Sequence, residues 1–107
     1  MEVNDIVRAL AALAHPVRLQ VFRALVVTGR SGLTPGAMQE GLDIPPATLS
    51  FHLKELAHAE LITQERDGRY LIYRAAYERM NSLIGYLTEN CCQGADCTVT
   101  PAASTCC

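Results

Sequence analysis

The fold is decided by the stretch PPATLSFHLKELAHA at residues 45–59. Its two prolines suit the start of a helix, and Leu49, Leu53 and Leu56 recur at helical spacing. This pattern predicts a helix that runs to about Ala59. The signal Thr34-Pro35 predicts a shorter helix just before it, ending by Gly41. Two helices joined by the tight connection at residues 42–44 have helix-turn-helix spacing.

Directly after these helices the residue pattern becomes typical of strands. Residues 61–66 and 69–74 are rich in Ile, Leu, Thr and Tyr. Asp67-Gly68 lies between them and is a pair favoured in a two-residue type I′ hairpin turn. A hairpin that follows a helix-turn-helix is a wing.

Three more helices are expected around this unit. The first begins at Val3 and ends near His15, because Pro16 disfavours a helical conformation in the residue before it. The second begins at Pro16 and closes at residues 29–32. The last runs from Ala76 to around Asn90, and residues 93–107 show no periodic pattern, which is typical of a loop or tail. The sequence predicts a mainly α fold with one β-hairpin, a winged helix-turn-helix of order ααααββα.

Composition limits the classes that remain. The chain has 107 residues, of which 50% are hydrophobic and 19% charged, as in a small globular domain. A domain this small buries only about 60–65% of its unfolded surface, so a second copy would help to stabilise it. No apolar run reaches the ~18 residues of a membrane span, and the N-terminus lacks a secretory signal, so we expect a cytoplasmic protein with no membrane partner. Because the net charge is −2, any nucleic-acid binding must come from a local basic patch.

The outer face of the helix at residues 45–59 carries side chains suited to a DNA major groove. Phe51 can touch thymine methyl groups, hydroxyl groups can bond to base edges or phosphates, and Lys54 can neutralise a phosphate. The alternative for Phe51 is packing under the wing. His52 lies nearer the buried edge, where a satisfied, semi-buried histidine is favoured over a base contact.

Two arginines flank the expected hairpin tip. They can grip backbone phosphates beside the helix, although charged residues are also common at ordinary exposed strand edges. Following a helix-turn-helix, the DNA-binding interpretation is favoured. The candidate DNA contacts are Thr48, Ser50, Phe51, His52, Lys54, Arg66 and Arg69.

All five cysteines are clustered at the C-terminal end, at positions 91, 92, 97, 106 and 107. A disulfide framework would spread its cysteines along the chain, so the cluster indicates a ligand site. Soft thiolates select soft ions, and three of them satisfy the pyramidal coordination of arsenite. A turn at Gly94 would let Cys97 fold back towards Cys91 and Cys92. Cys106 and Cys107 supply auxiliary thiols or have no role.

Other chemistries remain open for these thiols. A Cys91–Cys92 disulfide is disfavoured, because neighbouring Cα atoms are too close for the usual geometry. A pair such as Cys92–Cys97 could instead oxidise as a redox switch. Structural zinc is a weaker alternative, since it generally needs four ligands at paired spacing.

Three segments together resemble the ArsR/SmtB family of metal-sensing repressors: LAHPVRL at residues 13–19, ATLSFHLK at 47–54 and RDGRY at 66–70. The likeness covers roughly residues 6–90. It implies a winged-helix homodimer whose first and last helices form the interface. It also implies that the dimer binds a palindromic, double-stranded operator and leaves it when the effector ion binds.

The chain departs from this family at its usual ion sites. Many arsenic sensors of the family carry Cys-x-Cys in the first helix of the helix-turn-helix, where this chain reads LTPGAM at residues 33–38. The zinc sensors use His and carboxylate ligands on the last helix, but residues 77–90 contain no His. The tail ENCCQGADC at residues 89–97 resembles the C-terminal arsenite site of a divergent branch, which implies Cys91, Cys92 and Cys97 as ligands.

These inferences lead to one main expectation. Residues 1–90 form a DNA-binding and dimerisation domain, and residues 91–107 form an effector-binding tail for arsenite, As(III), or antimonite, Sb(III), with no organic cofactor. The effector could also be a methylated arsenical that needs only two thiols. Rival classes are a thiol-redox DNA-binding switch and an ion-binding or chaperone module that does not bind DNA. An enzyme is not expected, because no His–acid pair or phosphate-cradling glycine loop accompanies a nucleophile.

Overall fold

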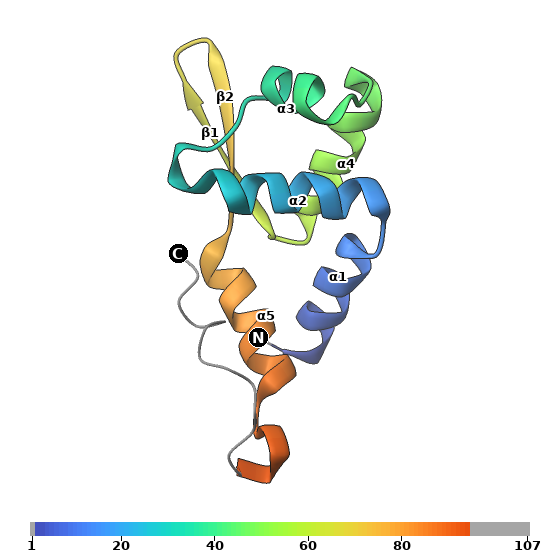
Figure 1. The fold of residues 1–107 in the computed structure, drawn as a ribbon, viewed down its shortest axis with the longest axis vertical. Coiled ribbons are helices and arrows are strands. Elements are labelled where there is room, and N and C mark those ends of the chain that lie inside the picture. The colour runs from blue at the N-terminus through green and yellow to red at the C-terminus, as the bar shows by residue number, and fades with distance from the viewer. Residues whose placement is uncertain (1, 95–107) are drawn as a thin grey trace.

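The structure is a computed structural model that describes residues 2–94. Within them the chain order is helix four times, hairpin, helix, which confirms the expected winged helix-turn-helix (Figure 1). The elements are α1 (Val3–Leu13), α2 (Pro16–Thr28), η1 (Gly29–Ser31), α3 (Pro35–Leu42), α4 (Pro46–His58), β1 (Ile62–Asp67), β2 (Tyr70–Ala75), α5 (Tyr77–Thr88) and η2 (Cys91–Gly94).

Local signals in the sequence account for the helix starts. Proline occupies the first turn of α2, α3 and α4, where its missing N–H is no loss. The backbone N–H of Val17 donates to His15 Nδ1 at 3.1 Å, and that of Ala37 donates to Thr34 Oγ1 at 3.2 Å. Helix α3 ends at Leu42, and its C-cap residue Asp43 adopts the left-handed conformation at φ 53°. The turn between α3 and α4 is therefore short, as expected.

The core lies where α2, α3 and α4 meet. Leu49, Leu53 and Leu56 are all buried, so the face of α4 that the sequence assigned to the core does face it. The largest fully buried side chains are Leu25, Met38, Leu49, Leu56, Leu61 and Val21. Because the leucine face is buried, the opposite face of α4 is held towards solvent.

The wing differs from expectation by one residue at its turn. Asp67 pairs with Tyr70 across the hairpin, so the two central turn residues are Gly68 and Arg69 rather than Asp67 and Gly68. Of these two residues only Gly68 has a positive φ, at 63°. That pattern fits a type II′ turn, in which glycine takes the first central position, and corrects the expected type I′ turn.

The base of the wing is joined to the segment before α3. Leu33 and Tyr73 exchange both backbone hydrogen bonds, each at 2.9 Å. At Gly32, with φ 71°, a Cβ atom would come within 2.6 Å of the Tyr73 carbonyl oxygen. Only glycine allows this close approach without displacing backbone. The wing is thereby fixed relative to the helix-turn-helix.

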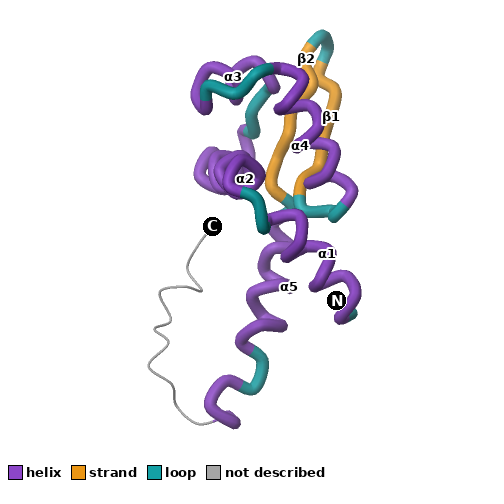
Figure 2. Tube along the Cα trace, turned by 90° about the vertical axis from the view of Figure 1, so that its right-hand side faces the viewer, coloured by secondary structure: helices purple, strands orange, loops and turns teal. Residues whose placement is uncertain are grey.

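Helices α1 and α5 lie together at the end of the molecule opposite the wing tip (Figures 1 and 2). Arg79 on α5 pairs with Asp5 on α1, with Nη2 3.7 Å from Oδ1, and more closely with Glu60 in the turn after α4, with Nη2 2.8 Å from Oε2. Within residues 2–94 no single helix is long and apolar enough to cross a membrane. Only the pair formed by Val3–Leu13 and Pro16–Ser31 reaches that length and composition, across a bend of 102°.

Candidate nucleic-acid interface and cysteine pair

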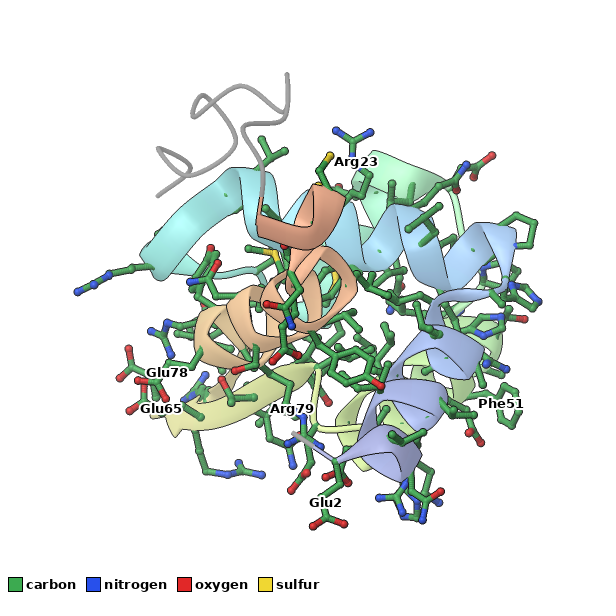
Figure 3. All side chains as sticks on the ribbon, turned by 90° about the horizontal axis from the view of Figure 1, so that it is seen from below. Glu2, Arg23, Phe51, Glu65, Glu78 and Arg79 are labelled. Carbon is green, nitrogen blue, oxygen red and sulfur yellow. The ribbon has the colours of Figure 1, made fainter. Side chains whose placement is uncertain are left out.

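Helix α4 presents four of the candidate DNA contacts on its exposed side. Thr48, Ser50, Phe51 and Lys54 are all exposed. Phe51 is 52% exposed and projects at the outer edge of the molecule in Figure 3. It therefore does not pack under the wing, and the structure leaves its ring available to a partner.

His52 is not on this surface. It is only 5% exposed, and its Nδ1 accepts a hydrogen bond from Arg18 Nε at 3.2 Å. Its ring centroid lies 4.6 Å from that of His15 and 5.5 Å from that of Phe51. The expectation that His52 contacts DNA is not met by this geometry, because the ring is buried against His15, which caps α2, and Arg18 on α2. His52 instead fits the alternative prediction, a buried histidine whose hydrogen bonding is satisfied within the protein.

Burial lowers the pKa of His52 below its ordinary value of 6.5. Repulsion from His15 and Arg18 lowers it further, while the carboxylate of Glu55 on the same helix opposes the shift. The neutral ring suits its contact, since a protonated Nδ1 could not accept the hydrogen bond from Arg18.

This shift predicts a pH dependence of stability. Because the folded-state pKa is lowered, the unfolded chain binds the proton more readily, and His52 makes folding less favourable as pH falls below 6.5. Urea unfolding followed by circular dichroism should show this loss, with a contribution of at most about 1.4 kcal/mol per pH unit from one proton. His52→Asn keeps an acceptor for Arg18 but does not titrate, so its profile should be flatter. An unchanged slope in this variant would contradict the assignment.

The wing tip supplies the other two candidates. Arg66 and Arg69 are exposed on either side of the turn. Farther down the strand, Arg74 is already engaged, with Nη1 2.9 Å from Glu65 Oε1 and Nε donating to the Arg30 carbonyl oxygen. Among residues 2–94, no ion pair involves Arg66, Arg69 or Lys54. These three residues are therefore exposed cations with no ion pair among the described residues, despite the net charge of −2.

Arg18 is a residue of this surface that sequence reasoning missed. Its guanidinium carbon lies 5.8 Å from the centroid of the Phe51 ring, beside the exposed face of α4. The only signal in the sequence was its position in the segment LAHPVRL, which resembled a family but carried no information about a contact with α4.

The first two cysteines come together just beyond α5. The helix ends at Thr88, and Asn90 and Cys92 adopt positive φ values of 56° and 54°. These turns bring the sulfurs of Cys91 and Cys92 to 3.7 Å, with both residues exposed. Two thiolates bound at about 2.3 Å to one ion in tetrahedral geometry would lie about 3.8 Å apart. The observed 3.7 Å is close to that value, in a structure in which Cys92 is disulfide-bonded rather than a thiolate.

The remaining thiolate candidates cannot be placed in the same way. Cys97, Cys106 and Cys107 lie outside the described residues. Within residues 2–94, no group of three His, Cys, Asp or Glu side chains is arranged to hold a metal ion. Cys92 is in a disulfide in this structure, so ion binding there requires the reduced chain. The three-thiolate site stays a prediction.

Similarity to known proteins agrees with this geometry. A helix-turn-helix domain family matches residues 13–65. The chain is 33% identical over 81 residues to the arsenical resistance operon repressor of Bacillus subtilis (strain 168), an alignment covering 76% of this chain and 73% of that protein.

Solved structures share the fold. An ArsR-like transcriptional regulator from Rhodococcus sp. RHA1 superposes with a TM-score of 0.74 at 21% identity, covering 84% of this chain and 82% of that chain. The homodimeric winged helix-turn-helix DNA-binding domain of Mb0332 from Mycobacterium bovis superposes with a TM-score of 0.66 at 23% identity, covering 89% and 88%. With the sequence match to the repressor, the winged helix places this chain in the ArsR/SmtB family of DNA-binding transcriptional regulators, which are not enzymes.

Proposed function

We propose that this family member is an arsenite-responsive repressor that binds operator DNA as a homodimer and dissociates when As(III) binds its C-terminal thiolates. The observation that supports the effector assignment is the proximity of two exposed cysteine sulfurs, 3.7 Å apart just beyond α5, which can act together as ligands once the Cys92 disulfide is reduced. The name of the Bacillus relative, an arsenical resistance operon repressor, supports the same effector class.

In this proposal residues 1–90 bind DNA and dimerise, and residues 91–107 bind the effector. Thr48, Ser50, Phe51 and Lys54 enter the major groove, while the wing-tip arginines grip phosphates beside it. His52 supports this surface from behind, because it is buried. The bound form is a duplex with two half-sites about one helical turn apart, one for each α4 of the dimer.

The dimer is proposed because α1 and α5 leave apolar faces without cover. Val3, Val7 and Leu10 are exposed along α1, and Ile84 and Leu87 along α5. Of the 12 residues of α5, only Leu83 is buried. An isolated helix of this length is marginal in water, so α5 needs a partner surface. A second copy would provide it, as the homodimeric state of the related Mycobacterium domain suggests for this chain.

The effector site combines Cys91 and Cys92 with Cys97 as the third ligand. Arsenite is soft and prefers sulfur over oxygen or nitrogen ligands. Antimonite shares this preference, and a methylated arsenical could use the pair alone. When neutral As(OH)3 binds three thiols, three S–H and three As–OH bonds are replaced by three As–S bonds and three waters. The exchange releases no net protons, so the affinity for arsenite should change little as pH falls below neutrality.

The proposed route to DNA release passes through α5. This helix carries the cysteine pair at one end and takes part in the proposed dimer interface. Its Arg79 also pairs with Glu60, which follows the recognition helix α4. An ion that draws the C-terminal segment against α5 would change the position of this helix in both protomers. The separation of the two recognition helices would then no longer match the half-sites.

One titration tests the proposal against its rivals. A duplex is first selected by the wild-type protein from a randomised pool, and its binding is measured by fluorescence anisotropy with the chain kept reduced. Arsenite should weaken binding roughly 5- to 150-fold, the usual range of allosteric coupling. Release by peroxide without any metalloid would instead support the redox switch. Arsenite uptake with no selectable duplex would support an ion-binding or chaperone module.

A further inference from the structure

Four side chains form a connected cluster where the turn between α1 and α2 meets the recognition helix. His15 caps the start of α2, Arg18 lies in its first turn, and Phe51 and His52 come from α4. The His15 and His52 rings are 4.6 Å apart, Arg18 Nε donates to His52 Nδ1 at 3.2 Å, and the guanidinium lies 5.8 Å from the Phe51 centroid. We call these residues the α2–α4 cluster.

Arg18 is held in this cluster at two points. Its Nε is directed at the His52 ring, and its guanidinium carbon lies over the Phe51 ring. A cation within about 6 Å of an aromatic centroid is attracted by the ring. Arginine can make both contacts together because its donors are fixed in a plane that also stacks, whereas the ammonium of lysine is a point charge.

Phe51 is consequently bounded on two sides. Arg18 covers one side of its ring, and His52 meets it nearly edge-on at an interplanar angle of 65°. The remaining surface is open to solvent. A half-exposed aromatic side chain would otherwise lose rotational freedom when it bound a groove, and this loss would oppose binding. The α2–α4 cluster already holds the Phe51 ring in the free protein, so less rotational freedom is lost when DNA binds.

We infer that Arg18 and His52 are positioning residues for operator recognition, which hold the Phe51 ring in the orientation that meets base edges. This inference rests on the proposed contact between Phe51 and DNA. Arg18 acts through Phe51 and not as a phosphate ligand. The competing role is a phosphate contact, because Arg18 also lines a pocket of about 310 Å³ in which Arg8 is a second cation and Glu55 a carboxylate.

A double-mutant cycle separates the two roles. Binding of the selected duplex and of an unrelated duplex is measured for wild type, Arg18→Gln, Phe51→Leu and the double variant at several salt concentrations. We expect Arg18→Gln to weaken selected binding about five- to tenfold and to leave unrelated binding unchanged. The double variant should bind no worse than Phe51→Leu, because Arg18 has then lost the residue it positions.

Conservative variants provide a second readout. Arg18→Lys keeps the charge but loses the planar contacts, so it should bind the selected duplex as weakly as Arg18→Gln does. Binding like wild type would overturn the inference. His52→Asn keeps an acceptor near Nδ1 and should bind nearly normally, whereas His52→Leu should not. The matched control is Arg23→Gln, an exposed arginine on α2 whose side chain points away on a different side from Phe51 (Figure 3). Circular dichroism confirms that each variant is folded.

The failures are distinguishable. If Arg18 instead binds a phosphate, the affinity losses of the two single variants add in the double variant. The dependence of log affinity on log salt concentration also becomes shallower by about one for Arg18→Gln. This result would overturn the positioning role. If Phe51→Leu binds the selected duplex more weakly while Arg18→Gln binds it normally, the positioning inference is overturned but the proposed DNA contact of Phe51 stands. If Phe51→Leu binds the selected duplex like wild type, both the positioning inference and the proposed DNA contact of Phe51 are overturned.

Discussion

Leu87→Asp should convert the protein to a monomer and weaken binding of the selected duplex by roughly 100-fold or more. Leu87 is 57% exposed on α5, within the face that we assign to the dimer. In a two-fold symmetric interface one substitution places two carboxylates in the contact, and neither would have a partner charge. Each monomer would then bind a single half-site, without the gain from holding two together.

Sedimentation velocity and anisotropy should detect these two changes. Val7→Asp, on the exposed face of α1, should have the same effect. Val27→Asp is the matched control, because Val27 is 78% exposed on α2 and lies outside the proposed interface. A Leu87→Asp protein that remains dimeric, or a monomer with undiminished affinity, would contradict the proposed assembly. Circular dichroism separates loss of the dimer from unfolding, since dimers often lack a stable folded monomer.

The helix-turn-helix could be predicted from local sequence because each of its signals acts locally. Prolines at the first turns mark the helix starts, and the leucine spacing of α4 assigns its buried face. The wing turn lies one residue later than the sequence predicts, because it is not fixed by a local signal alone. Asp67-Gly68 suits one turn type, but the strand register joins Asp67 to Tyr70, and register depends on pairing along the whole hairpin.

The α2–α4 cluster could not be predicted in this way. Arg18 and His52 are 34 residues apart, and only the packing of α2 on α4 brings them together. Sequence reasoning placed His52 at the buried edge of its helix but could not supply the donor that satisfies it. The approach of the Cys91 and Cys92 sulfurs depends on left-handed backbone at Asn90 and Cys92. Asparagine favours this conformation more than most residues, but cysteine does not, so nothing in the sequence signals the second turn.

Serine substitution of the proposed ligands should abolish the response to arsenite without changing DNA affinity in its absence. Cys91 and Cys92 are exposed beyond the end of α5 and contribute nothing to the core. Cys91→Ser, Cys92→Ser and Cys97→Ser should therefore each bind the selected duplex like wild type. Arsenite should then shift that affinity less than about twofold, against the 5- to 150-fold expected for wild type.

The comparison among these variants identifies the effector chemistry. If the ion needs three thiolates, the three single variants fail alike, and the Cys106→Ser/Cys107→Ser double variant serves as the responsive control. If a methylated arsenical is the effector, Cys97→Ser keeps its response, because the pair at 3.7 Å can bind that ion alone. Release that persists in all three single variants would place the ion elsewhere in the chain. The pH profile adds an independent criterion. Because the thiol protons leave with the arsenite hydroxides as water, release by arsenite should be nearly independent of pH below neutrality, whereas release by a divalent metal ion, which displaces thiol protons into solvent, would weaken there.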